Sequence, residues 1–119
     1  MDVRKKTGKL GETAAAAFLE RQGVRILEKN FHSRFGEIDL IGIDEPYLAV
    51  IEVKTRRGWG SGHGAEAVDL RKQHKICSAF NYYRMKRQLS DFVPVRFDVI
   101  EVDESSNCRW IKNAFEYME

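Results

Sequence analysis

Residues 36–55 read GEIDLIGIDEPYLAVIEVKT, and this stretch decides the fold. Polar and apolar side chains alternate over residues 36–43, which is typical of a strand with one buried face. Residues 47–55 are mostly aliphatic and β-branched, as in a central strand that is covered on both faces. The Asp-Glu-Pro sequence at 44–46 favours a turn. We therefore predict two consecutive strands joined by a tight turn.

The flanking segments add two helices and three further strands. Apolar side chains recur at helical spacing from about residue 5 to residue 22, and again from residue 65 to about residue 87. Strands are expected at 24–31, 95–102 and 108–114. The order α-β-β-β-α-β-β predicts an α/β fold, with a mixed central sheet of four to five strands flanked by helices. A single domain over residues 1–119 fits this length.

The composition excludes several classes of protein. There is no apolar run of about 18 residues, so neither a transmembrane helix nor a membrane partner is expected. The basic N-terminus leads into polar residues rather than a signal core, so we expect a cytoplasmic protein. Cys77 and Cys108 form no CxxC pattern and are expected to be reduced thiols in or near the core.

Positive charge is concentrated in one part of the chain. Residues 53–90 carry a net charge of +7, although the whole chain carries +2. This segment fits a face that binds nucleic acid, and a solvated helix face is the alternative. Lys72 falls on the apolar stripe of the second helix, where it must reach an anion or extend to solvent. The residues expected to contact nucleic acid are Arg56, Arg57, Trp59, Lys72 and Lys75.

The two central strands carry the candidate chemistry. A two-residue turn at Glu45-Pro46 would set Asp39 directly across from Glu52, and Lys54 would share the face of Glu52. Two opposed carboxylates destabilise a sheet unless a cation such as Mg²⁺ lies between them. A lysine beside them suits phosphodiester hydrolysis, since it can contact the scissile phosphate or the attacking water. The alternative is a pair of ordinary solvent-face acids, with Lys54 paired to Glu37.

Five motifs in order along the chain resemble the YraN-like family of bacterial proteins. They are Gly8–Ala14 (GKLGETA), Gly36–Leu40 (GEIDL), Ile51–Arg56 (IEVKTR), Val68-x-x-x-Lys72-x-x-x-Ile76 and Arg96–Val99 (RFDV). The resemblance implies a restriction-endonuclease-like fold of the PD-(D/E)xK type, similar to Holliday-junction resolvases. It also implies that Glu12 joins Asp39 and Glu52 as a metal ligand, that Lys54 is the catalytic lysine, and that the chain forms a homodimer.

We therefore expect a Mg²⁺- or Mn²⁺-dependent endonuclease that acts on DNA, including branched or structured DNA. Asp39, Glu52 and Lys54 would be its catalytic residues. One alternative is a non-catalytic nucleic-acid-binding module that keeps the same fold. A weaker one is a nucleotide-binding protein that uses the glycine-rich residues 60–65 (GSGHGA). The sequence leaves DNA versus RNA open.

Overall fold

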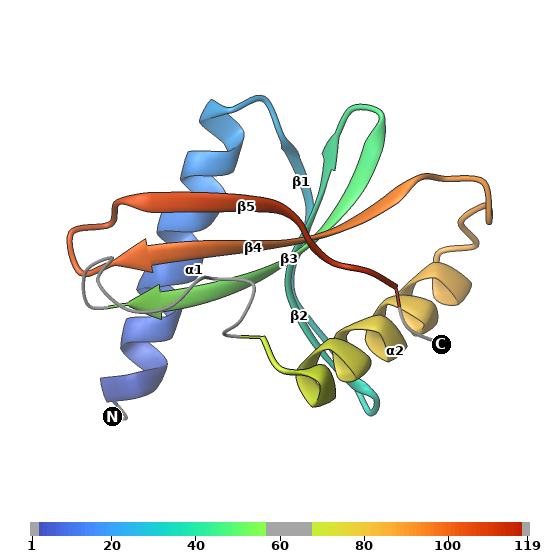
Figure 1. Cartoon of the computed structure of the whole chain (residues 1–119), viewed down its shortest axis with the longest axis horizontal. Coiled ribbons are helices and arrows are strands. Elements are labelled where there is room, and N and C mark those ends of the chain that lie inside the picture. The colour runs from blue at the N-terminus through green and yellow to red at the C-terminus, as the bar shows by residue number, and fades with distance from the viewer. Residues whose placement is uncertain (1–2, 57–67, 118–119) are drawn as a thin grey trace.

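The computed structural model describes residues 3–56 and 68–117, with the elements in the predicted order (Figure 1). These elements are α1 Val3–Arg21, β1 Arg25–Ser33, β2 Gly36–Asp44, β3 Tyr47–Arg56, α2 Leu70–Lys86, β4 Val95–Asp103 and β5 Cys108–Phe115. Helix α1 ends shortly before Gly23, whose φ of 93° is a conformation that glycine adopts readily. Among the described residues, no helix is long and apolar enough to cross a membrane.

The five strands form one mixed sheet in the order β1-β2-β3-β4-β5. Strands β3 and β4 are parallel, and the other neighbours are antiparallel. Helix α2 lies in the crossover between the two parallel strands, as such a connection requires. The α/β fold with a mixed sheet that the sequence predicted is confirmed.

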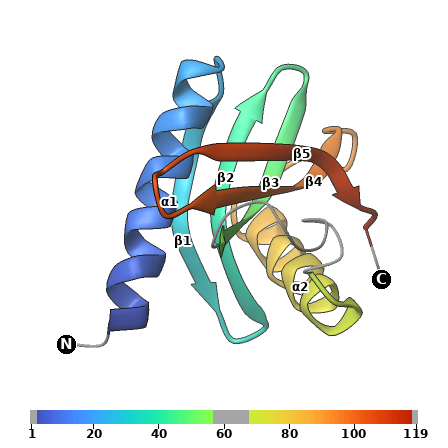
Figure 2. The same ribbon diagram turned by 60° about the vertical axis from the view of Figure 1, so that its left-hand side comes forward.

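The two helices cover opposite faces of the sheet (Figure 2), so there are two cores. The α2-side core contains Val50 of β3 and Phe80 of α2. The α1-side core contains Ile51 of β3 and Leu19 of α1. Successive residues of β3 thus point to opposite cores, and this strand is buried on both faces.

The turn between β2 and β3 contains two residues, Glu45 and Pro46, as predicted. The paired residues run from Asp44↔Tyr47 to Leu40↔Ile51, which is the expected register. Beyond this pair the ladder ends. Ile38 belongs to the α2-side core, although Leu40, two positions away, belongs to the α1-side core. The alternation of side chains therefore breaks at Asp39, where β2 departs from β3.

Helix α2 begins later than the sequence predicted. Val68 and Asp69 precede it rather than belonging to it. The reason is a cap, because the Lys72 amide donates to Asp69 Oδ1 at 2.8 Å. Cys77 is buried and Cys108 is half-buried, and both are free thiols, as expected.

Candidate functional site

Asp39 and Glu52 lie close together, but not as a simple pair in a ladder. The backbone amide of Val53 donates a hydrogen bond to Asp39 Oδ2 at 2.8 Å. The Asp39 side chain therefore accepts a hydrogen bond from a β3 amide, at the point where the β2 backbone no longer pairs with β3. This bond holds the Asp39 carboxylate against β3, where its charge acts on Glu52.

Glu52 is a buried acid, with 5% of its surface exposed. The pKa of Glu52 is raised from 4.5 to about 7. Burial is the largest cause of this shift, and the charge of the neighbouring Asp39 is the second. Lys72 and Lys54 oppose the shift but do not cancel it. The alternative that these acids are ordinary solvent-face charges is therefore wrong for Glu52.

Two lysines approach the same oxygen of Glu52. Lys72 Nζ lies 3.4 Å and Lys54 Nζ lies 3.7 Å from Glu52 Oε1. Lys72 thus contacts an anion. This is one of the two possibilities predicted from its position on the apolar face of α2, the other being extension to solvent. Lys54 does not pair with Glu37, which contacts His32 Nδ1 at 3.1 Å instead.

Glu12 brings a third acid to the site from helix α1. Partial burial and the charge of Asp39 raise the pKa of Glu12, and a hydrogen bond with the Asn30 side chain opposes the rise. Both Glu12 and Glu52 are within hydrogen-bonding reach of Asp39. Asp39 is therefore the acid that links α1, β2 and β3.

Asn30 was not among the site residues predicted from the sequence. Its φ of 53° lies in the left-handed region, which asparagine tolerates better than most residues. This backbone conformation occurs within β1, and the sequence of that strand does not predict it. Asparagine at this position was the one available signal.

The chemistry of the three acids fits a hard divalent cation, which prefers carboxylate oxygens. The pKa of Glu52 is raised to about 7 chiefly because the carboxyl is buried, and the charge of Asp39 contributes to the rise. Within residues 3–56 and 68–117, however, no three acidic, histidine or cysteine side chains are arranged so that they could hold a metal ion. In the observed arrangement, two ammonium groups contact Glu52.

Comparison with known proteins identifies the family. A family model described as "Uncharacterised protein family UPF0102" matches residues 11–102. The chain belongs to this family. The resemblance to the YraN-like family is thereby confirmed.

Relatives in the UPF0102 family match the chain over almost its whole length. A UPF0102 protein of Legionella pneumophila (strain Corby) is 39% identical over 115 residues, which cover 96% of this chain and 98% of the relative. One from Clostridium botulinum (strain Loch Maree / Type A3) is 42% identical, with coverage of 94% and 95%. One from Persephonella marina is 41% identical, with coverage of 92% of each chain. None of these names specifies an activity.

Of the five residues predicted to contact nucleic acid, two have contacts within the fold. Lys72 contacts Glu52, as described above. Arg56 forms an ion pair with Glu101, a buried acid that Arg109 Nη1 also approaches at 3.7 Å. Lys75 is exposed on α2. The other two, Arg57 and Trp59, and the glycine-rich segment 60–65 lie outside the described residues.

Some of the positive charge in the basic segment stabilises the fold rather than facing the site. Arg87 forms an ion pair with Glu28 on β1. Arg84 Nε lies 4.0 Å from the exposed Asp91. The cationic face predicted from the sequence is therefore narrower than the count of lysines and arginines suggested.

Asp98 is buried on β4 but does not belong to the site. Arg96 Nε donates to Asp98 Oδ1 at 2.9 Å, so the two residues form an ion pair within the sheet. The Trp110 indole and the Asn113 amide also donate to Asp98, each at 2.9 Å. With these partners the carboxylate is satisfied, so we assign it a structural role.

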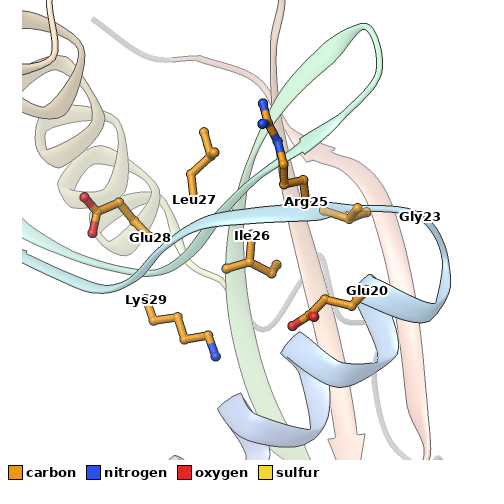
Figure 3. Close-up of a pocket in the computed structure, with 8 residues that line it drawn as sticks. Glu20, Gly23, Arg25, Ile26, Leu27, Glu28 and Lys29 are labelled. Atoms are coloured by element: carbon orange, nitrogen blue, oxygen red, sulfur yellow. The ribbon is translucent and has the colours of Figure 1, made fainter.

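A hollow of about 560 Å³ lies between the end of α1 and β1 (Figure 3). Its lining includes Glu20, Arg25, Glu28 and Lys29, whose charges offset one another. Figure 3 shows that Arg25 and Lys29 point in opposite directions. Without convergent polar groups, this hollow is not a candidate for the chemistry.

Proposed function

We propose that the chain is a Mg²⁺- or Mn²⁺-dependent endonuclease that hydrolyses phosphodiester bonds in DNA, including branched or structured DNA. The observation that carries this proposal is the meeting of Glu12, Asp39 and Glu52 from three different elements. Lys54 lies beside the buried member of the group. A buried acid with a raised pKa beside other acids is typical of a functional site.

The three carboxylates would hold the cation. When bound, a divalent cation lowers the pKa of water and neutralises the charge that develops on a phosphate. Glu52 keeps its proton up to about pH 7 in the cation-free protein, and a cation would compete with that proton. The oxygen-only donor set favours Mg²⁺ or Mn²⁺ over softer metals.

The two lysines would supply the positive charge that faces the substrate. Their ammonium groups contact Glu52 Oε1. A cation bound to Glu52 would replace these contacts, so the ammonium groups of Lys54 and Lys72 could bind an incoming phosphate. Lys54 lies two residues from Glu52 on β3, so it would contact the scissile phosphate or the attacking water.

A specific observation favours one alternative function, a non-catalytic nucleic-acid-binding module. Lys54 and Lys72 already neutralise Glu52, and the described residues contain no three-ligand group with the spacing for a metal. However, acids beside a nucleic-acid site repel phosphate, so a protein that only binds would gain from losing them. We therefore rank this function second.

A cleavage assay tests the proposal. The full chain would be incubated with duplex, single-stranded and four-way-junction DNA in Mg²⁺ or Mn²⁺, beside the Asp39→Ala, Glu52→Ala and Lys54→Ala variants. Asp91→Ala is a matched control, because its carboxylate is 90% exposed. We expect cleavage by the wild type and the control, with a loss of at least about 100-fold in the other three. Equal rates for all five proteins, with DNA binding retained, would favour the binding module.

A further inference from the structure

A hollow of about 310 Å³ lies beside the turn between β1 and β2. The turn lies beneath helix α2 in Figure 1. The residues that line the hollow are Ser33, Arg34, Phe35, Gly36, Glu37, Lys72 and Lys75. They come from the turn, the adjoining strand ends and one face of α2.

This hollow adjoins the carboxylate site through Lys72. Lys72 lines it and also contacts Glu52 at 3.4 Å. Glu37 lines it as well, and its charge contributes to the raised pKa of Glu12. A chain that enters the carboxylate site can therefore continue into the hollow.

The charge of the hollow suits a phosphate backbone. Arg34, Lys72 and Lys75 are its cations, and Glu37 is the one acid among the described lining residues. Glu37 already has a partner in His32. The excess of positive charge would attract phosphates and make binding depend on salt.

The turn also presents an aromatic ring. Phe35 is 41% exposed, and the Arg34 guanidinium carbon lies 4.9 Å from the centre of its ring. Tyr82 of α2 also contacts this ring, with the two ring centres 5.9 Å apart. Cations beside an exposed ring are the arrangement that proteins use to bind single strands, whose bases stack on the ring.

The turn packs closely against α2. Gly36 has a φ of 155°, and a Cβ there would lie 2.8 Å from the Lys75 carbonyl oxygen. The backbone of the turn therefore packs directly on the helix. The Ser33 hydroxyl donates to the Gly36 carbonyl at 2.9 Å and accepts from the Phe35 amide at 3.2 Å. These contacts hold the backbone on both sides of Phe35.

We propose that this hollow binds a single nucleic-acid strand that leads away from the carboxylate site. Arg34, Lys72 and Lys75 face its phosphates, and Phe35 stacks on an unpaired base. This inference rests on the proposed function, because it takes nucleic acid as the substrate. It narrows that substrate to nucleic acid with unpaired nucleotides beside the scissile bond, since the bases within a duplex are already stacked on one another.

Binding measured without metal tests this inference separately from cleavage. Fluorescence anisotropy in EDTA would compare a labelled single strand with a duplex of the same length. The variants are Phe35→Ala and Phe35→Trp, and Phe92→Ala is the matched control, because Phe92 is 95% exposed on another surface. We expect Phe35→Ala to weaken single-strand binding about tenfold and to leave duplex binding unchanged. Phe35→Trp should keep the affinity, and Phe92→Ala should have no effect.

A charge variant adds an independent readout. Lys75→Gln should reduce the slope of log affinity against log salt by about one, and Lys86→Gln should leave it unchanged. Lys86 is a suitable control, because its ammonium lies over Tyr82, on α2 outside the hollow.

Three results would overturn the inference. The first is equal single-strand affinity for Phe35→Ala and Phe92→Ala. The second is an equal loss of duplex and single-strand binding. The third is displacement of the strand by polyglutamate as effectively as by unlabelled DNA, which would indicate an acidic protein partner. If binding depends on Phe35 but Mg²⁺ and Mn²⁺ give no cleavage, the proposed function fails and the strand site stands.

Discussion

Replacing Glu52 by glutamine should stabilise the cation-free protein at alkaline pH. Glu52 is 5% exposed, and burial followed by the charge of Asp39 raises its pKa from 4.5 to about 7. A raised carboxyl pKa means that the folded state holds the proton more tightly than the unfolded state. The resulting destabilisation is absent well below pH 4.5, grows as the pH rises towards 7, and is complete above that value. The shift corresponds to about 3 kcal/mol at most.

The assay is urea unfolding in EDTA at about pH 5 and about pH 8. Glu116→Gln serves as the control, because Glu116 is exposed. We expect Glu52→Gln to exceed the wild type in free energy of unfolding by up to about 3 kcal/mol at the higher pH. The difference should fall to about 1 kcal/mol or less at the lower pH, because the Glu52 carboxyl is protonated in the folded protein and only partly protonated in the unfolded one.

The opposite sign would refute this reasoning. If Glu52→Gln were less stable than the wild type at about pH 8, the contacts with Lys54 and Lys72 would outweigh the effect of burial. Glu52 would then stabilise the fold as an ion-pair partner, rather than destabilise it as a buried ionised carboxylate.

Three further predictions concern the surroundings of the site. Lys72→Met should raise the pKa of Glu52 further, because the charge of Lys72 lowers it, and a carbon-13 NMR titration of the carboxyl group would measure this. Gly11→Ala should lower the free energy of unfolding by about 1–3 kcal/mol, because its Cβ would lie 2.6 Å from Thr55 Cγ2. Adding Thr55→Ser, which removes that methyl group, should restore part of the loss in urea unfolding. Asp98→Ala should lower the free energy of unfolding by about 3–5 kcal/mol in the same assay, since it leaves the buried Arg96 with Asp44 alone and removes the acceptor of the Trp110 indole.

The parts of the fold that local patterns determine could be predicted from the sequence. The alternation at 36–43 and the turn at Glu45-Pro46 were enough to give the β2–β3 register. That register in turn brought Asp39 towards Glu52. Both helices were found from their apolar spacing, although the Asp69 cap moved the start of α2.

The features that the sequence did not predict depend on contacts between distant parts of the chain. The parallel register of β3 and β4 places Glu101 where it pairs with Arg56, and the crossover between them gives no local signal of that register. The break of alternation at Asp39 arises because β1 and β2 bend to pack beneath α2. The same packing brings the Phe35 turn beside the lysines of that helix, which the strand pattern alone does not predict.

Manganese binding tests most directly the claim that acids from α1, β2 and β3 act as one cation site. Electron paramagnetic resonance would count free Mn²⁺ in titrations of the full chain, with and without an oligonucleotide. The proteins compared are the wild type, Asp39→Asn and the exposed control Asp91→Asn. We predict that the wild type and the control bind Mn²⁺ equally, and that Asp39→Asn loses at least about tenfold in affinity. Equal binding by all three proteins, in both conditions, would contradict the claim.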